Sequence, residues 1–284
     1  MSETTSATEP RPKHREPLLE LSDITKRFGG VTALDHVSLD IDAGEVVGLV
    51  GDNGAGKSTL VKTISGAYRP DSGRLLFGGA VREFATPGAA KDAGIETVYQ
   101  DLALVDTLDA AGNIFLGREL IRFGAGPIRF LDHRAMREQA FALLERLGLK
   151  LPDPSAEVGT LSGGQRQSVA ISRALYTDPK LVILDEPTSA LAVKEAERVL
   201  ELTQTLREQG VAVILISHTI RDVMATTDRI IVLHRGRKMA DLVTADTDEE
   251  EVVRYIVGQD RVGQNRGGRA GQRTNSETQN GAEA

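Results

Sequence analysis

Apolar and polar positions alternate with two different periods along most of this chain. Between residues 18 and 258, short apolar runs typical of buried strands alternate with longer segments in which apolar residues recur at helical spacing. Such an alternation favours an α/β fold in which a parallel sheet is flanked by helices on both faces. The predicted strands are 46–50, 74–78, 95–99, 180–184, 211–216 and 230–233, and the predicted helices are 57–65, 86–93, 133–147, 161–176, 194–208 and 220–226.

The beginning of the chain follows a different pattern. Residues 18–21 predict a strand, and residues 37–41 alternate between apolar and polar side chains, which is typical of a half-exposed strand. Between them, residues 25–31 contain neighbouring glycines and Phe28, and they predict a turn that carries one aromatic side chain. We therefore expect a small antiparallel sheet before the α/β core.

The middle of the chain is dominated by helical spacing. The apolar residues from 107 to 148 recur at helical intervals, apart from an interruption at 123–127, and the clearest amphipathic helix is 133–147. We expect a helical subdomain over about 101–177, inside a single nucleotide-binding domain over 18–258. Residues 1–17 and 259–284 lack this patterning, and their polar composition predicts disordered ends.

The composition narrows the class of protein. Hydrophobic residues make up 40% and charged residues 26% of the 284 positions, which is ordinary for a soluble globular protein. The absence of cysteine excludes disulfides and thiolate metal sites and fits a reducing cytoplasm. The net charge of −7 argues mildly against a nucleic-acid partner, although a local basic face is compatible with it. Because no apolar run approaches the ~20 residues of a membrane span, we expect any membrane role to depend on a partner.

One stretch carries a specific chemical signature. Residues 51–59 match the pattern G-x-x-x-x-G-K-[ST] and lie between a predicted strand and a predicted helix, which is the context of a phosphate-binding P-loop, the Walker A motif. Glycines let backbone N–H groups point at phosphate oxygens, and the helix adds the positive end of its dipole. The predicted nucleotide-binding residues here are Gly51, Asp52, Asn53, Gly54, Ala55, Gly56, Lys57, Ser58 and Thr59.

Within this loop, two side chains have distinct predicted roles. The Lys57 ammonium can reach the β- and γ-phosphates of a nucleotide, and the Ser58 hydroxyl can bind Mg²⁺. The motif alone indicates that the chain binds a nucleoside triphosphate, and it does not indicate a function beyond that binding.

The remaining candidate residues are weaker signals when each is taken alone. Asp185 and Glu186 follow an apolar strand as in a Walker B motif, where Asp185 would hold Mg²⁺ and Glu186 would orient and deprotonate water. Two adjacent acidic residues are just as common in an ordinary loop as in a Walker B motif. Taken alone, Gln100 is most simply interpreted as a surface glutamine and His218 as a structural histidine. Phe28 is most simply interpreted as a turn aromatic that packs on the core.

The order of these motifs is more specific than any one of them. The P-loop, then Gln100, then Leu-Ser-Gly-Gly-Gln at 161–165, then the acidic pair and Ser217-His218 resemble the ATP-binding cassette of ABC transporters over about residues 18–258. The resemblance implies an α/β P-loop NTPase core with a small N-terminal antiparallel β subdomain and a helical subdomain that carries the 161–165 signature.

The resemblance also implies a role for each matching position. Phe28 would stack on adenine, Gln100 would meet Mg²⁺ and the attacking water and relay nucleotide state to a membrane partner, and His218 would contact the γ-phosphate. The implied catalytic residues are Glu186, His218 and Gln100, and the implied Mg²⁺ ligands are Ser58, Gln100 and Asp185.

A second cassette is implied by the signature itself. Ser162, Gly163 and Gly164, followed by Gln165, match the signature that closes on the γ-phosphate of ATP bound to the opposite subunit. Since neither half of the site is complete in one chain, ATP hydrolysis would require a dimer, either a homodimer or a pair with a sister subunit.

Two segments indicate the kind of cassette. Residues 98–106 and 111–119 resemble the ribose-, xylose- and fructose-type bacterial sugar importers. The resemblance implies integral membrane permease subunits, a periplasmic or lipid-anchored sugar-binding protein, and a place in the cytoplasm on the inner face of the plasma membrane. An importer ATPase for a non-sugar solute is the alternative.

One position departs from the family pattern. Cassettes commonly carry Asp where this chain has Ala192, and that carboxylate normally makes a hydrogen bond across the dimer interface. We expect hydrolysis to survive, because Glu186 and His218 are present, but coupling between two sites is in doubt. A regulatory subunit with weak turnover is therefore one alternative, and a soluble cassette that acts on nucleic acid or ribosomes is another, which the acidic charge disfavours.

Overall fold

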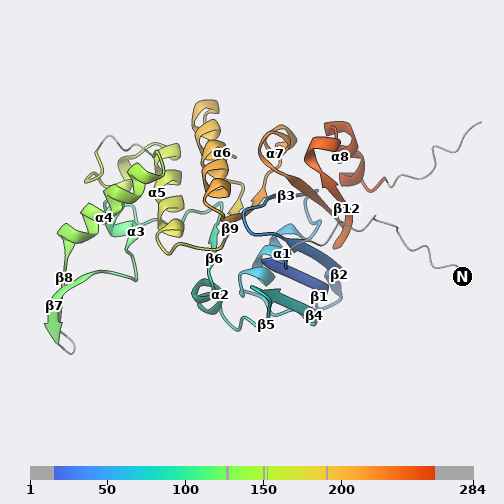
Figure 1. Cartoon of the computed structure of the whole chain (residues 1–284), viewed down its shortest axis with the longest axis horizontal. Helices are drawn as coiled ribbons and strands as arrows, with labels where there is room; N and C mark the ends of the chain where they lie inside the picture. The colour runs from blue at the N-terminus through green and yellow to red at the C-terminus, as the bar shows by residue number, and fades with distance from the viewer. Residues whose placement is uncertain (1–15, 126–127, 150, 152, 190, 260–284) are drawn as a thin grey trace, which may run out of the picture.

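The computed structural model describes residues 16–125, 128–149, 151, 153–189 and 191–259 (Figure 1). These residues form a six-stranded sheet, a four-stranded antiparallel sheet and a two-stranded hairpin, with a group of helices at one end of the molecule (Figure 1). The elements of the first half are β1 (Leu19–Phe28), β2 (Val31–Ile41), β3 (Val46–Gly51), α1 (Lys57–Ile64), β4 (Ser72–Phe77), β5 (Ala80–Arg82), α2 (Pro87–Ala93), β6 (Ile95–Val98), α3 (Ala110–Ile114), β7 (Ile121–Ala125), β8 (Ile128–Leu131) and α4 (His133–Arg146).

The second half builds the rest of the core. Its elements are a 3₁₀ turn (Val158–Thr160), α5 (Gly163–Leu175), β9 (Leu181–Asp185), α6 (Val193–Glu208), β10 (Ala212–Ile216), α7 (Ile220–Thr226), β11 (Arg229–His234), β12 (Arg237–Val243), a second 3₁₀ turn (Thr244–Asp246) and α8 (Glu249–Ile256). The predicted fold class is confirmed: an α/β core, a small N-terminal antiparallel β subdomain, and a helical subdomain. The exact limits of the helical subdomain stay a prediction, and residues 1–15 and 260–284 of the predicted disordered ends lie outside the described residues.

The central sheet has the strand order β12-β11-β3-β10-β9-β6. Neighbouring strands from β11 to β6 pair in parallel, and β12 adds an antiparallel edge beside β11. All residues of β3 and β10 are buried, as expected where helices or a second sheet cover both faces of a parallel sheet. The sequence analysis did not predict β12 or α8, which complete this end of the core.

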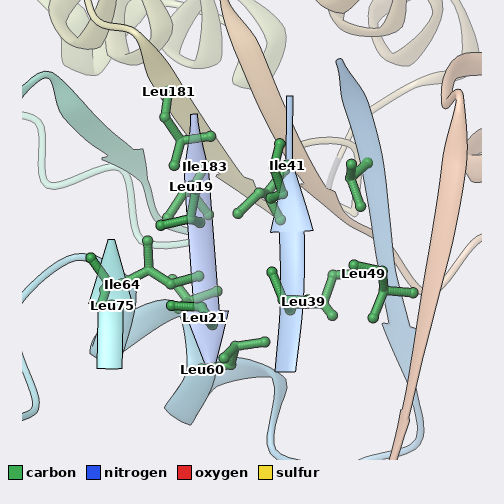
Figure 2. Packing of buried hydrophobic residues seen from close by; sticks show 14 of the residues in the cluster. Leu19, Leu21, Leu39, Ile41, Leu49, Leu60, Ile64, Leu75, Leu181 and Ile183 are labelled. Atoms are coloured by element: carbon green, nitrogen blue, oxygen red, sulfur yellow. The ribbon is translucent and has the colours of Figure 1, made fainter. Parts of the chain in front are cut away.

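The antiparallel sheet, with strand order β2-β1-β4-β5, packs against one side of this core. Figure 2 shows apolar side chains of β1, β2 and β4 meeting those of α1, β3 and β9 in one cluster. Since apolar burial is the main favourable contribution to folding, this shared cluster holds the two sheets together. The labelled members are Leu19, Leu21, Leu39, Ile41, Leu49, Leu60, Ile64, Leu75, Leu181 and Ile183.

The turn predicted over residues 25–31 is wrong in its extent. β1 continues to Phe28, which pairs with Val31 of β2, and the connection consists only of Gly29 and Gly30. Gly29 adopts a φ of +57°, and a two-residue loop with glycine follows the twist of the flanking strands. Phe28 therefore lies at a strand end rather than inside a longer turn.

The stretch from 107 to 148 also differs from its predicted helical pattern. A β-hairpin of β7 and β8 lies between α3 and α4, so the interruption extends beyond 123–127, and its described residues belong to strands. Phe123 and Phe130 stack across this hairpin with ring centroids 4.7 Å apart. A cross-strand aromatic pair stabilises strands in a way that helical spacing does not reveal.

Phe115 belongs to an apolar cluster that joins the helical subdomain to the central sheet. This side chain is 0% exposed, and its ring centroid lies 4.5 Å from that of Tyr176 at the end of α5. The contact joins the segment after α3 to α5, which carries the signature motif.

Replacing Phe115 with alanine should lower the free energy of unfolding by about 3–5 kcal/mol, because the vacated volume lies in a closed core. The matched control is Phe141→Ala on α4, whose side chain is 46% exposed, and we expect a change within about 0.5 kcal/mol there. Urea denaturation followed by circular dichroism measures both variants. Equal losses in the two variants would contradict this assignment of the core.

Candidate functional site

The carboxyl ends of the central parallel strands converge at one edge of the sheet. Ile216 at the end of β10 pairs with Leu49 of β3 on one side and with Asp185 of β9 on the other. Val98 at the end of β6 pairs with Leu184 of β9. The P-loop, the acidic pair, the Ser217-His218 step and Gln100 all follow these strand ends, so the structure brings the motifs of the core to one edge. This is where open α/β sheets bind ligands.

Glycine is required at two points of the P-loop for different local reasons. Gly51 has a φ of +151°, and a Cβ there would lie 2.3 Å from the carbonyl oxygen of Leu233. Gly56 has a φ of +107°, and a Cβ there would lie 2.7 Å from the carbonyl oxygen of Ala33. The loop is thus pressed between β11 and the start of β2, which shapes it into a backbone cradle.

Lys57 occupies the centre of this cradle as the first residue of α1. Its ammonium donates hydrogen bonds to the carbonyl oxygens of Gly51 (2.6 Å) and Asp52 (3.1 Å). Burial lowers the pKa of Lys57, while the charges of Glu186, Asp52 and Asp185 act in the opposite direction. A phosphate would give this buried cation a stronger, charge-assisted partner than a neutral carbonyl.

Glu186 is held in an unusual backbone conformation directly after β9. Its φ is +53°, and its backbone N–H donates a 2.9 Å hydrogen bond to the carbonyl oxygen of Ile216. Its carboxylate Oε1 forms an ion pair with Nε2 of His218, and only 14% of the Glu186 side chain is exposed. A non-glycine residue with positive φ is costly unless the surroundings hold it, and such residues gather at functional sites.

The surroundings of Asp185, the last residue of β9, shift the pKa of its carboxyl in opposite directions. Burial raises the pKa of its carboxyl, and the negative charge of Glu186 raises it further, while Lys57, His218 and Lys62 lower it. A nearby cation would relieve this crowding of negative charge. The carboxylate of Asp185 and the exposed hydroxyl of Ser58 are hard oxygen ligands that suit Mg²⁺.

The protein offers few metal ligands at this edge. Among the described residues there is no cluster of three or more His, Cys, Asp or Glu side chains that could hold a metal. Mg²⁺ typically binds one or two carboxylates together with substrate phosphates and water, so a sparse protein ligand set fits that ion.

Gln100 and Phe28 are both exposed side chains. Gln100 is exposed just beyond β6, and the hydroxyl of the preceding Tyr99 lies 3.4 Å from Oγ of Ser65 at the end of α1. Phe28 is 44% exposed and meets Tyr68 edge to face, with centroids 5.2 Å apart. Sequence reasoning missed Tyr68, although another aromatic soon after the P-loop helix in a chain with few aromatics was a usable signal.

The signature motif forms the start of α5. Ser162 caps the helix in a reciprocal arrangement: its N–H donates to Oε1 of Gln165 (2.9 Å), and Gln165 N–H donates to Ser162 Oγ (3.4 Å). Ser162 and Gly163 are exposed, and the Ser162 hydroxyl donates to Glu195 of α6 at 3.0 Å. Within the described part of the chain, the side-chain hydrogen bonds of Ser162 and Gln165 stay inside the motif or go to α6 rather than to the P-loop.

Ala192 is the N-cap of α6 and makes no side-chain capping bond there. Its carbonyl oxygen accepts the N–H groups of Glu195 and Ala196 at 2.9 Å each. The aspartate common at this position in cassettes would supply a carboxylate at the helix start, which this chain lacks.

Comparison with known proteins places the chain in a family. Residues 34–189, more than half of the chain, match the family model described as ABC transporter. The xylose/arabinose import ATP-binding protein XylG of Sulfolobus acidocaldarius is 47% identical over 84% of this chain and 93% of its own length. The fructose import ATP-binding protein FrcA of Rhizobium meliloti is 45% identical over 86% of this chain and 95% of its own length.

A relative of different length is also similar. The ribose import ATP-binding protein RbsA 1 of Rubrobacter xylanophilus is 45% identical over 85% of this chain, but the match spans only 47% of that longer protein. The chain therefore spans about half of the ribose relative and nearly all of the xylose/arabinose and fructose relatives.

Solved structures agree with these sequence matches. A nucleotide-free ATP-binding cassette from an ABC transporter has a TM-score of 0.73 and 29% identity, covering 85% of this chain and 99% of its own. A dimeric cassette in a post-hydrolysis state with ADP and Pi has a TM-score of 0.67 and 28% identity, covering 80% and 98%. The chain belongs to the ABC transporter family, and it is an ATPase cassette of that family. No described helix is long and apolar enough to cross a membrane.

Replacing Ala192 with aspartate should stabilise the isolated chain by about 1 kcal/mol, because a side-chain oxygen at the N-cap accepts a free helix N–H. Urea denaturation measures the gain. Ala192→Asn is the matched variant, since it caps without adding a charge near Glu195. If neither variant is more stable than the parent, the start of α6 is not limited by its missing cap.

Proposed function

We propose that this chain is the ATP-hydrolysing subunit of an ABC importer that energises carbohydrate uptake through a separate membrane permease. The observation that carries the hydrolytic part is the ion pair between Glu186 and His218 beside the P-loop. It supports a hydrolytic site, because a carboxylate and an imidazole meet close enough to the buried Lys57 for the charge of Glu186 to act on the Lys57 pKa.

Each group has a role in the proposed reaction. Backbone N–H groups of the loop at 51–59 and the Lys57 ammonium bind the phosphates. Glu186 accepts a proton from the attacking water, and His218 orients that carboxylate and contacts the γ-phosphate. Phe28 stacks on adenine, with Tyr68 supporting the ring edge to face. Gln100 contacts the water and reports nucleotide state to the permease.

Mg²⁺ completes the proposed site. Ser58, Asp185 and Gln100 supply oxygen ligands, and the ion would neutralise phosphate charge when bound. The raised pKa of Asp185 supports this assignment, because a carboxyl destabilised by burial and by Glu186 gains most from a cation.

The second half of the site would come from another cassette. The exposed residues Ser162 and Gly163 are available to a γ-phosphate bound in the opposite subunit, while Gly164 is buried beneath Glu195 and Gln165 is half-buried. The N-terminus of α5, at the positive end of the helix dipole, suits an anion. The dimeric cassette with ADP and Pi among the structural neighbours supports a dimer, and we propose a homodimer.

The carbohydrate assignment rests on the relatives. They are import ATP-binding proteins for xylose/arabinose, fructose and ribose, and they align with nearly all of the cassette. We propose that the chain works on the cytoplasmic face of the plasma membrane, attached to permease subunits that receive sugar from a periplasmic or lipid-anchored binding protein. Uptake of labelled xylose, fructose and ribose by vesicles carrying the assembled transporter tests the substrate class; ATP-driven uptake of none of the three, with uptake of a non-sugar solute, would overturn it.

Glu186→Gln should lower ATP turnover by at least about 10²-fold, because the amide cannot take the proton from water. The same variant should accumulate as ATP-bound dimers, which size-exclusion chromatography with light scattering detects. Glu197→Gln, on an exposed position of α6, is the charge-matched control and should hydrolyse like the parent.

The outcome separates the leading proposal from its alternatives. Equal turnover by the parent and Glu186→Gln would remove Glu186 from the role of base. Negligible turnover by the parent dimer would favour the regulatory subunit suggested by Ala192. Salt-sensitive binding of RNA or DNA would favour a nucleic-acid role.

A further inference from the structure

Glu195, in the first turn of α6, contacts the signature motif in two ways. Its Oε1 accepts the hydrogen bond from the Ser162 hydroxyl at 3.0 Å. Its side chain also packs over Gly164, so closely that a Cβ on Gly164 would lie 2.6 Å from Cδ of Glu195. The carboxylate therefore sits directly against the residues that the proposed function assigns to the γ-phosphate of a partner.

The hydroxyl of Ser162 has one proton to donate. At neutral pH the terminal oxygens of a nucleotide are anionic acceptors, as is the Glu195 carboxylate. The hydroxyl cannot donate to both at once, so the two acceptors compete for its single proton. Binding a phosphate through the Ser162 hydroxyl must therefore break the Ser162–Glu195 hydrogen bond.

We propose that Glu195 is a positioning residue that holds the Ser162 hydroxyl away from the γ-phosphate and thereby opposes ATP-dependent closure of the dimer. The proposal rests on the proposed function, in which the signature binds ATP of the opposite subunit. The dimer forms only when the γ-phosphate outcompetes Glu195, so this carboxylate keeps closure reversible.

The Glu195 carboxylate stabilises the single chain locally, although it opposes closure of the dimer. α6 (Val193–Glu208) has Ala192 as its N-cap and lacks a side-chain cap there, and Glu195 places a negative charge in its first turn. An acid near a helix N-terminus stabilises the positive end of the helix dipole. Removing Glu195 should thus have opposite effects on the single chain, which becomes less stable, and on the ATP-bound dimer, which becomes tighter.

The test measures dimer dissociation constants in the Glu186→Gln background, by sedimentation with ATP and separately with ADP. We expect Glu195→Ala to lower the dissociation constant with ATP by about tenfold or more and to leave it unchanged with ADP, which has no γ-phosphate. Glu197→Ala, the same charge change on an exposed position of the same helix, should change neither. Glu195→Gln keeps the side-chain shape and should tighten the ATP dimer in the same direction if Glu195→Ala folds poorly.

A double variant tests whether Glu195 acts through Ser162. In a Ser162→Ala background, Glu195→Ala should give no further tightening, because the hydroxyl that both acceptors share is gone. A gain that persists without that hydroxyl, a gain with ADP, or an ATP dimer that is unchanged or weaker overturns the proposal. If the Glu186→Gln parent itself forms no ATP dimer, the proposed function fails as well; if that parent does dimerise, only this inference is at stake.

Discussion

Parallel hydrogen bonding between strands that are distant in the chain holds this molecule's chemistry in place. β3, β9 and β10 are separated by long insertions, yet their ladder fixes Ile216 opposite both Leu49 and Asp185. Since a parallel ladder aligns carboxyl ends, the P-loop, the acidic pair and His218 must emerge together. Burial of the apolar side chains of these strands and of β1, β2 and β4 offsets the conformational entropy lost when the strands come together.

Electrostatics then organises the groups at that edge. Burial disfavours the charged forms of both Lys57 and Asp185, as the opposite directions of their pKa shifts indicate. Each charge is tolerated because opposite charges lie near it: Glu186 and Asp185 for Lys57, and Lys57 and His218 for Asp185. A cluster of buried charges that balance one another suits a strongly charged ligand, and a polyphosphate is such a ligand.

The signature side of the molecule follows a different principle, in which local capping provides the order. Ser162 and Gln165 satisfy each other's backbone N–H groups, so the capping box at the start of α5 is local in the chain. Glu195 joins this cap to α6 and so to the segment that carries Ala192. The same hydroxyl thus serves a helix cap and, in the proposed function, a phosphate, and the two uses compete for it.

The sequence by itself determined the α/β class, the P-loop between strand and helix, and the order of the remaining motifs, because strand burial and glycine-dependent turns are local in the chain. It misjudged the turn around Phe28 and the stretch containing Phe123 and Phe130, since cross-strand pairing depends on partners that periodicity does not specify. Only the tertiary structure decided which polar side chains face each other, namely Glu186 with His218 and Ser162 with Glu195. Those contacts join residues that the chain separates, and their geometry follows from how the sheet and helices pack rather than from any single segment.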